Sequence, residues 1–121
     1  MLEKPKRHNY KNLKIWILAI QVVDDVYDIL SKFPIEERFG LVSQMSRCSV
    51  SIPSNIAEGS ARTDKSFSHF LDIALGSSFE LSTQLIISKN RGYISKEQLN
   101  KIEVKLEEFQ KMTMGFQNKI N

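Results

Sequence analysis

The sequence of 121 residues contains one cysteine, three prolines and five glycines, and each scarcity narrows the class of protein. A single cysteine excludes a disulfide within the chain, as is typical of proteins in a reducing compartment, so we expect a cytoplasmic protein. No run of about 18 apolar residues occurs, so we predict no membrane-spanning helix, and the charged first residues lack the apolar core of a signal peptide. The few prolines and glycines lie near breaks between apolar segments or at special sites, which favours a helical chain.

The sequence also lacks the short motifs of common catalytic, metal-binding and phosphate-binding sites. A helical bundle that holds two metal ions needs Glu-x-x-His on two helices, and this pattern does not occur. Neither a phosphate-binding glycine loop nor a Gly-x-Ser-x-Gly turn is present. Cys48 and His69 resemble a nucleophile and a base by residue type only, because Cys48 falls on the apolar face of its predicted helix, where an inert thiol is usual. We therefore predict no enzymatic activity, no cofactor and no metal.

Charge is unevenly distributed along a chain whose composition is that of one folded domain. Hydrophobic residues make up 41% of the sequence and charged residues 26%, which excludes a disordered protein. Residues 1–14 hold five basic residues and one acidic residue, whereas residues 15–121 hold twelve basic and thirteen acidic residues. We therefore predict a basic N-terminal arm over residues 1–11 and a nearly neutral domain over residues 12–121.

Apolar residues recur at steps of three and four in four segments, the spacing of a helix with one buried face. The segments cover about residues 13–32, 41–59, 64–89 and 95–120. Asn12 is the predicted N-cap of the first segment, and Ser95 with Gln98 forms a capping box before the last. Because the connections are short, the sequence predicts an all-α fold: an antiparallel, up-down-up-down four-helix bundle.

One stepped series in each segment is predicted to form the core. These series are Leu13, Trp16, Ile20, Val23, Tyr27 and Leu30; Met45, Cys48, Ile52, Ile56 and Gly59; Phe67, Leu71, Ala74, Ser78, Leu81 and Leu85; and Ile102, Leu106, Phe109, Phe116 and Ile120. Other apolar residues fall outside them: Ile15, Val22, Ile29, Val50, Ala57, Leu75, Phe79 and Ile86. A monomer would expose many of these, and large exposed apolar patches mark interfaces, so we expect a homo-oligomer.

Pro53 lies inside the second helical pattern, where it has no N–H to donate and its ring crowds a carbonyl. An exposed helix would lose roughly 3 kcal/mol in this way. Short polar side chains near it can bond the freed backbone groups: Ser49, Ser51, Ser54 and Asn55. We predict a kinked helix that ends near Gly59 in a left-handed conformation.

Asn55 and Glu58 are the most distinctive polar residues near this proline, and they allow two interpretations. In the first they form a binding pair. In the second, which we favour, Asn55 repairs the proline break and Glu58 pairs with Arg62 one turn later. By polarity alone, Glu80 is the candidate partner of Arg47.

The motif Ser-Ile-Pro-Ser-Asn-Ile-Ala-Glu-Gly at residues 51–59 is accompanied by other short motifs across the chain. These include Leu13, Trp16, Phe33, Pro34, Glu37, Phe39, Gly40, Leu41, Gln44, Arg47, Phe70, Leu71, Ala74, Gly76, Ser77, Glu80, Leu81, Gly92 and Tyr93. As a set they resemble the small four-helix-bundle proteins encoded in intervening sequences of 23S rRNA genes, a family also labelled S23 ribosomal protein. The chain departs from the family at Val42, Ser46 and Cys48, where relatives usually carry threonine, a basic residue and alanine.

The resemblance implies a four-helix bundle that assembles as a closed pentamer, as characterised relatives do; the sequence pattern itself gives no copy number. It implies no settled biochemical activity. The family's setting inside rRNA genes makes RNA a natural ligand. The chain also resembles accessory bundle proteins of diversity-generating retroelements, which associate with a reverse transcriptase and nucleic acid.

Basic residues are the remaining functional signal, since clustered Lys and Arg neutralise phosphates. The candidates are Lys4, Lys6, Arg7, Lys11, Lys14, Arg47, Arg62 and Lys65. A solubilising tail is the common alternative for such a run. We expect a non-enzymatic oligomer that binds structured nucleic acid, RNA before DNA, with low sequence specificity. The alternative is a scaffold or accessory subunit for a partner protein encoded nearby.

Overall fold

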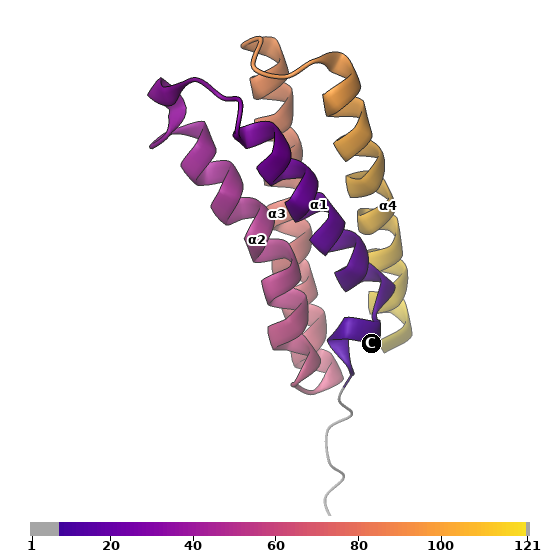
Figure 1. Cartoon of the computed structure of the whole chain (residues 1–121). Helices are drawn as coiled ribbons and strands as arrows, with labels where there is room; N and C mark the ends of the chain where they lie inside the picture. The colour runs from indigo at the N-terminus through magenta and orange to yellow at the C-terminus, as the bar shows by residue number, and fades with distance from the viewer. Residues whose placement is uncertain (1–7, 121) are drawn as a thin grey trace, which may run out of the picture.

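The computed structural model describes residues 8–120, and every regular element in that range is helical. Four α-helices are joined by short connections (Figure 1): α1 (Lys14–Leu30), α2 (Leu41–Ser60), α3 (Asp64–Asn90) and α4 (Lys96–Ile120). Two 3-10 turns, η1 (Tyr10–Asn12) and η2 (Ile35–Glu37), precede α1 and α2. The predicted all-α class with four helices is confirmed, and no strand occurs in the part of the chain that the structure describes.

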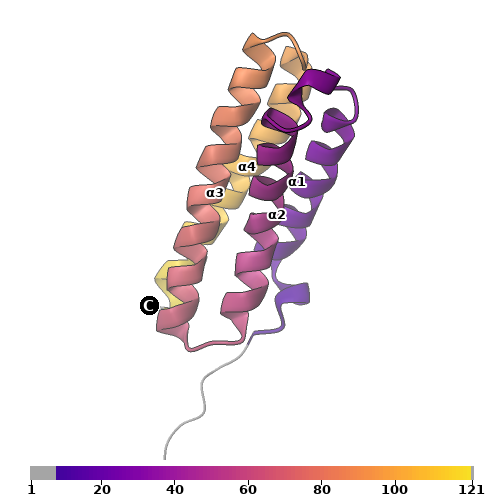
Figure 2. The same ribbon diagram turned by 90° about the vertical axis from the view of Figure 1, so that its left-hand side faces the viewer.

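Each long helix packs against two others: α2 against α1 and α3, and α4 against α1 and α3 (Figures 1 and 2). The order of contacts between α2 and α3 is reversed along the chain. Near the start of α2, Met45 Sδ accepts a hydrogen bond from Ser88 Oγ at 3.4 Å, whereas near its end Gly59 lies against Phe67. Helices α2 and α3 are in extensive contact, and at Gly59 they are too close to leave room for a side chain.

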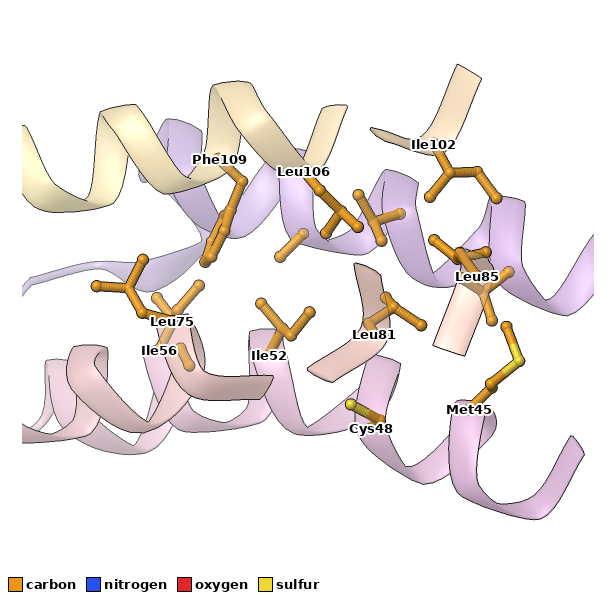
Figure 3. Packing of buried hydrophobic residues seen from close by; sticks show 14 of the residues in the cluster. Met45, Cys48, Ile52, Ile56, Leu75, Leu81, Leu85, Ile102, Leu106 and Phe109 are labelled. Carbon is orange, nitrogen blue, oxygen red and sulfur yellow. The ribbon is translucent and has the colours of Figure 1, made fainter. Parts of the chain in front are cut away.

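The core lies between the four helices (Figure 3). Its largest fully buried side chains are Met45, Ile52, Ile56, Phe67, Leu71, Leu81, Leu85, Ile102, Leu106 and Phe109, together with Val22 and Val26. Ten of these twelve belong to the series predicted for the second, third and fourth segments, which are therefore correct in phase. Phe116 and Ile120, predicted for the last series, are only partly buried.

The series predicted for the first helix is wrong in phase. The buried residues of α1 are Ile15, Ala19, Val22, Val26, Ile29 and Leu30. Trp16, Ile20 and Val23 are half-buried, and 51% of Tyr27 is exposed. Both series have helical spacing, but small and β-branched side chains fill the core more closely, and Trp and Tyr carry polar atoms that need partners. The apolar residues that α1 leaves outside the core therefore include Trp16, Ile17, Ile20, Val23 and Tyr27.

The start of α1 also differs from the prediction. Asn12 belongs to η1, and Leu13 takes the N-cap position of α1 without a side-chain cap. Asn9 is the residue that caps, because its side chain accepts a hydrogen bond from Lys11 N at 3.2 Å. At α4 the predicted capping box is confirmed: Gln98 N donates to Ser95 Oγ at 3.1 Å, and Ser95 N donates to Gln98 Oε1 at 2.8 Å.

Helix α2 continues through Pro53 as one α-helix to Ser60. The Asn55 side-chain amide donates hydrogen bonds to Ser51 O at 2.8 Å and to Ser51 Oγ at 2.9 Å. Both acceptors belong to the residue one helical turn before Asn55 in α2. The carbonyl left without a helix donor by Pro53 is that of Ser49, four residues earlier, so Asn55 supports the turn beside the proline, and the prediction that it repairs the break itself is wrong. The expected kink stays a prediction.

The predicted left-handed conformation of Gly59 is wrong, because this glycine lies inside α2. A Cβ at this position would lie 2.7 Å from Phe70 Cβ and 2.8 Å from Phe67 Cδ1, so glycine is needed where α2 and α3 approach closely. The left-handed glycine is Gly92, with φ of 81°, which follows Arg91, the C-cap of α3. There Tyr93 N donates to Ser88 O at 2.9 Å, which closes the helix end.

Helix α3 is long and apolar enough to span a membrane. The sequence had predicted no such helix, because it contains no uninterrupted run of about 18 apolar residues. Core helices of soluble proteins meet the same criteria, and α3 contributes Phe67, Leu71 and Leu85 to the core. Packing within the chain accounts for only part of its apolar composition, because 33% of its most apolar window is buried and Phe79 and Ile86 are exposed.

Candidate functional site

Four of the predicted basic residues come together at one end of the bundle, where α1 and α3 begin and α2 and α4 end (Figure 2). Lys11 lies in η1, Lys14 opens α1, Arg62 follows α2, and Lys65 lies in the first turn of α3. Lys119, in the last turn of α4, adds a cation that the sequence did not single out. All five side chains are exposed, and we call this surface the basic end. Lys4, Lys6 and Arg7 lie outside the described residues.

Arg47 does not belong to the basic end. It lies thirteen residues before Ser60, or about 20 Å along the helix axis. There it lines a polar groove of about 280 Å³ between α2 and α3. The predicted ion pair with Glu80 does not form between these described residues. Glu80 Oε1 instead accepts a hydrogen bond from Gln84 Nε2 at 3.4 Å.

Arg62 is held in place on the basic end by two contacts. Its Nη2 lies 3.4 Å from Glu58 Oε1, which confirms the predicted pair one helical turn apart. Its guanidinium carbon lies 4.8 Å from the centre of the Phe70 ring. An exposed pair of this kind adds little stability, so its main effect is on the direction of the Arg62 side chain. Asn55 and Glu58 each have a partner close by in the chain, Ser51 and Arg62 respectively, as the favoured interpretation predicts for Glu58.

His8 fixes the position at which the chain joins the basic end. Its backbone N donates to Ser60 O at 3.2 Å, and its Nε2 lies 3.4 Å from Asp64 Oδ1. The imidazole packs against two aromatic rings, with centroid distances of 5.2 Å to Phe67 and 5.6 Å to Phe116. Residues 8–11 were predicted to belong to the arm, but they lie against the bundle. The sequence gives no sign that His8 packs against the bundle, because this histidine lies in a basic stretch and outside any series of apolar residues with helical spacing.

A cavity of about 470 Å³ lies beside the basic end, between the start of α1 and the end of α4. Lys14 and Lys119 belong to both the basic end and the lining of this cavity. Leu13, Met112 and Phe116 supply apolar lining. Sequence reasoning missed the cavity because its walls come from the two ends of the chain.

Exposed apolar surface gathers in three other places. A groove of about 320 Å³ between α1 and α2 is lined by Tyr10, Trp16, Ile20, Val23, Val50, Pro53, Ser54 and Ala57. On α3, the exposed apolar residues are Ile73, Phe79, Ile86 and Ile87. In the segment between α1 and α2, Ile35 is 70% exposed and Phe39 is 84% exposed.

The chemistry of Cys48 is that of a packed thiol. Its Sγ donates a hydrogen bond to Ser77 O at 3.1 Å. Burial, together with the nearby Glu80 carboxylate, raises the pKa of the thiol to about 12. The reactive thiolate is therefore scarce at neutral pH. Among residues 8–120, no three His, Cys, Asp or Glu side chains are grouped so as to hold a metal ion.

The chain is similar to a known protein family in sequence and to a solved structure in fold. The sequence profile of a family described as 23S rRNA-intervening sequence protein matches residues 11–115. A crystal structure of a protein of unknown function from the S23 ribosomal protein family of Bacteroides thetaiotaomicron is similar, with a TM-score of 0.78. The two sequences are 23% identical, and the match covers 85% of this chain and 97% of that chain. No curated protein matches this sequence significantly.

Proposed function

The chain belongs to the 23S rRNA-intervening sequence protein family, and from this premise we propose that it is a non-enzymatic protein that binds structured nucleic acid, RNA before DNA. The observation that carries the proposal is the gathering of Lys11, Lys14, Arg62 and Lys65 at the end of the bundle where α1 and α3 begin. Residues that are far apart in the sequence thus lie at one end of the bundle, which supports a common role in phosphate binding.

The charge balance of the basic end supports phosphate binding. Of the nearby acids, Glu58 is paired with Arg62, and Asp64 faces His8. The four lysines of this surface form none of the ion pairs found among the described residues. Such cations release counterions when they neutralise phosphates, and they carry little information about base sequence.

Assembly is the second part of the proposal. We infer an antiparallel, up-down-up-down bundle, supported by the reversed order of contacts between α2 and α3, and a ring of five copies, as the family resemblance implies. The apolar groove between α1 and α2 and the exposed apolar residues of α3 supply surfaces for contacts between copies. In a ring, every basic end would face the same rim, so avidity would strengthen binding.

A salt titration of binding to structured RNA and to duplex DNA tests the nucleic-acid proposal. We expect log affinity to fall linearly with log salt, with a slope of about −0.9 for each duplex-DNA phosphate neutralised. The test variant replaces Lys11, Lys14, Arg62 and Lys65 by Gln. The control variant replaces Lys32, Lys89, Arg91 and Lys96 by Gln, which removes the same charge near the opposite end of the bundle.

Weak binding by the test variant, with normal binding by the control and unchanged oligomeric mass, would support the basic end. Equal losses in both variants would indicate a general charge effect. Absence of binding by the parent protein at about 50 mM salt, where phosphate contacts are strong, would reject the proposal.

One observation favours a protein-binding scaffold as the second candidate function. Among the residues that the structure describes, Phe39 is the most exposed large apolar side chain, and the guanidinium of Arg38 lies 4.8 Å from its ring centre. Glu37 holds this segment: Tyr93 OH donates to Glu37 Oε2 at 2.8 Å, and Leu41 N donates to Glu37 Oε1 at 3.3 Å. An aromatic residue and an arginine on a fixed segment are typical of binding hot spots. If Phe39→Ser leaves capture of every protein partner unchanged, the scaffold candidate fails.

A further inference from the structure

The cavity between α1 and α4 combines apolar walls with two cations at its rim. Its volume of about 470 Å³ lies within the usual range for small-molecule sites. Leu13, Met112 and Phe116 give it an aliphatic, a thioether and an aromatic surface, and Lys14 and Lys119 are exposed beside them. A ligand suited to both parts has a flat apolar body and negative charge close to it.

Gly115 keeps the cavity open. A glycine inside a long helix is less stable than alanine, so it usually has a packing reason, as Gly59 has. At Gly115 a Cβ would meet nothing within 4 Å, so packing within the chain does not require glycine there. Because Gly115 lines the cavity, a larger side chain at this position would occupy cavity space without disturbing the core.

The cavity adjoins the proposed phosphate-binding surface. Lys14 and Lys119 are common to the cavity and the basic end. The ring of Phe116 lies 5.6 Å from the ring of His8 and 5.5 Å from that of Phe67, in edge-to-face contacts that restrict its orientation. His8 is also the first residue that the structure describes, and it contacts Phe116 of the cavity wall.

We propose that this cavity takes one unpaired base of a bound nucleic acid, while Lys14 and Lys119 contact the phosphates on either side of that base. The proposal rests on the proposed function and narrows it: the preferred ligand has single-stranded segments, such as loops or bulges. Every base has an apolar face that can pack against an aromatic ring, so this contact tolerates different base sequences. In a continuous duplex the bases are stacked and paired, and none can enter.

Filling the cavity provides the test. Gly115→Leu is compared with Asn118→Leu, which adds the same side chain to the next turn of α4 outside the cavity lining. The probes are a single-stranded oligoadenylate and an RNA duplex of equal length at low salt. Gly115→Leu is expected to bind the single strand about tenfold more weakly and the duplex as well as the parent does, because it loses one base contact. Asn118→Leu is expected to bind both probes normally.

The lysines provide an independent readout. Lys14→Gln and Lys119→Gln should each lower the steepness of the salt dependence for the single strand by about 0.7, the value for one lost phosphate contact. Lys111→Gln, an exposed lysine of α4 outside the lining, is the control and should leave the slope unchanged. If the slope of log affinity against log salt is the same in all three variants, Lys14 and Lys119 do not contact phosphates, and the proposal is overturned.

Failure of this proposal can be told apart from failure of the proposed function. If the parent protein binds neither probe, both fail. If the parent binds both probes and Gly115→Leu binds the single strand as the parent does, only the cavity proposal fails. If Gly115→Leu changes the oligomeric mass measured by light scattering, the cavity is a contact between copies, and the proposal is overturned.

Discussion

At the scale of single residues, two helix glycines differ in what surrounds them. A Cβ at Gly59 would overlap Phe67 and Phe70, whereas a Cβ at Gly76 would meet nothing within 4 Å. Gly59→Ala is expected to lower the free energy of unfolding by about 1–3 kcal/mol through overpacking. Gly76→Ala should raise it by up to about 1 kcal/mol through helix propensity. Urea denaturation measures both, and equal destabilisation would contradict the close approach of α2 and α3 at Gly59.

Cys48 gives a prediction about pH. The pKa of its thiol is raised from 9.0 to about 12, so the folded state holds this proton more tightly than the unfolded state does. The resulting stabilisation is present below about pH 9 and is lost as the pH rises towards 12. Between about pH 8 and pH 10, the parent should therefore lose more stability in urea denaturation than Cys48→Ala does.

At neutral pH, Cys48→Ala itself should cost about 1 kcal/mol, because it leaves a small cavity. Iodoacetamide should alkylate the folded parent slowly, since the thiolate is the reactive form. The same pH dependence in both proteins, together with rapid alkylation, would show that the thiol is not held in its neutral form.

At the scale of helices, Pro53 links the backbone of α2 to the surface groove. Pro53→Ala restores one helix donor, which is worth up to about 3 kcal/mol in an exposed helix, and it removes part of a buried ring. We expect the fold to be retained, as measured by circular dichroism. We also expect weaker assembly, because Pro53 lines the groove between α1 and α2. A dilution series by light scattering tests this, and unchanged assembly would exclude a role for the proline at the interface.

The helices also show how far the sequence could predict the fold. In α2, α3 and α4 one apolar series dominates, so most of the core could be identified in advance. In α1 the series through Trp16 and the series through Val22 have the same spacing, and only packing against α2 and α4 decides between them. The basic end could be predicted only in part, because Lys119 was not singled out and Arg47, which was predicted with the other basic residues, lies elsewhere. The roles of His8 and Phe116 could not, because they depend on contacts between the two ends of the chain.

At the scale of the whole molecule, the exposed apolar surface predicts assembly. Light scattering on the purified protein should give a mass near five times 13.9 kDa. Ile20→Lys should reduce that mass while the helical content stays the same, because this half-buried residue lines the apolar groove. Val22 is 0% exposed, so Val22→Lys is the contrasting variant, and it should unfold the bundle. A stable parent monomer at micromolar concentration would contradict the ring.

The first and last described residues lie at the same end of the bundle (Figure 1). A short linker between them would therefore close the four helices into a continuous circle, and the chain could be opened instead at an exposed turn, such as the one after Gly92. Such a circular permutant should keep the core, since none of the contacts between helices depends on which helix is translated first. It would also move the free ends to the opposite end of the bundle, leaving the lysine-rich surface without a chain terminus.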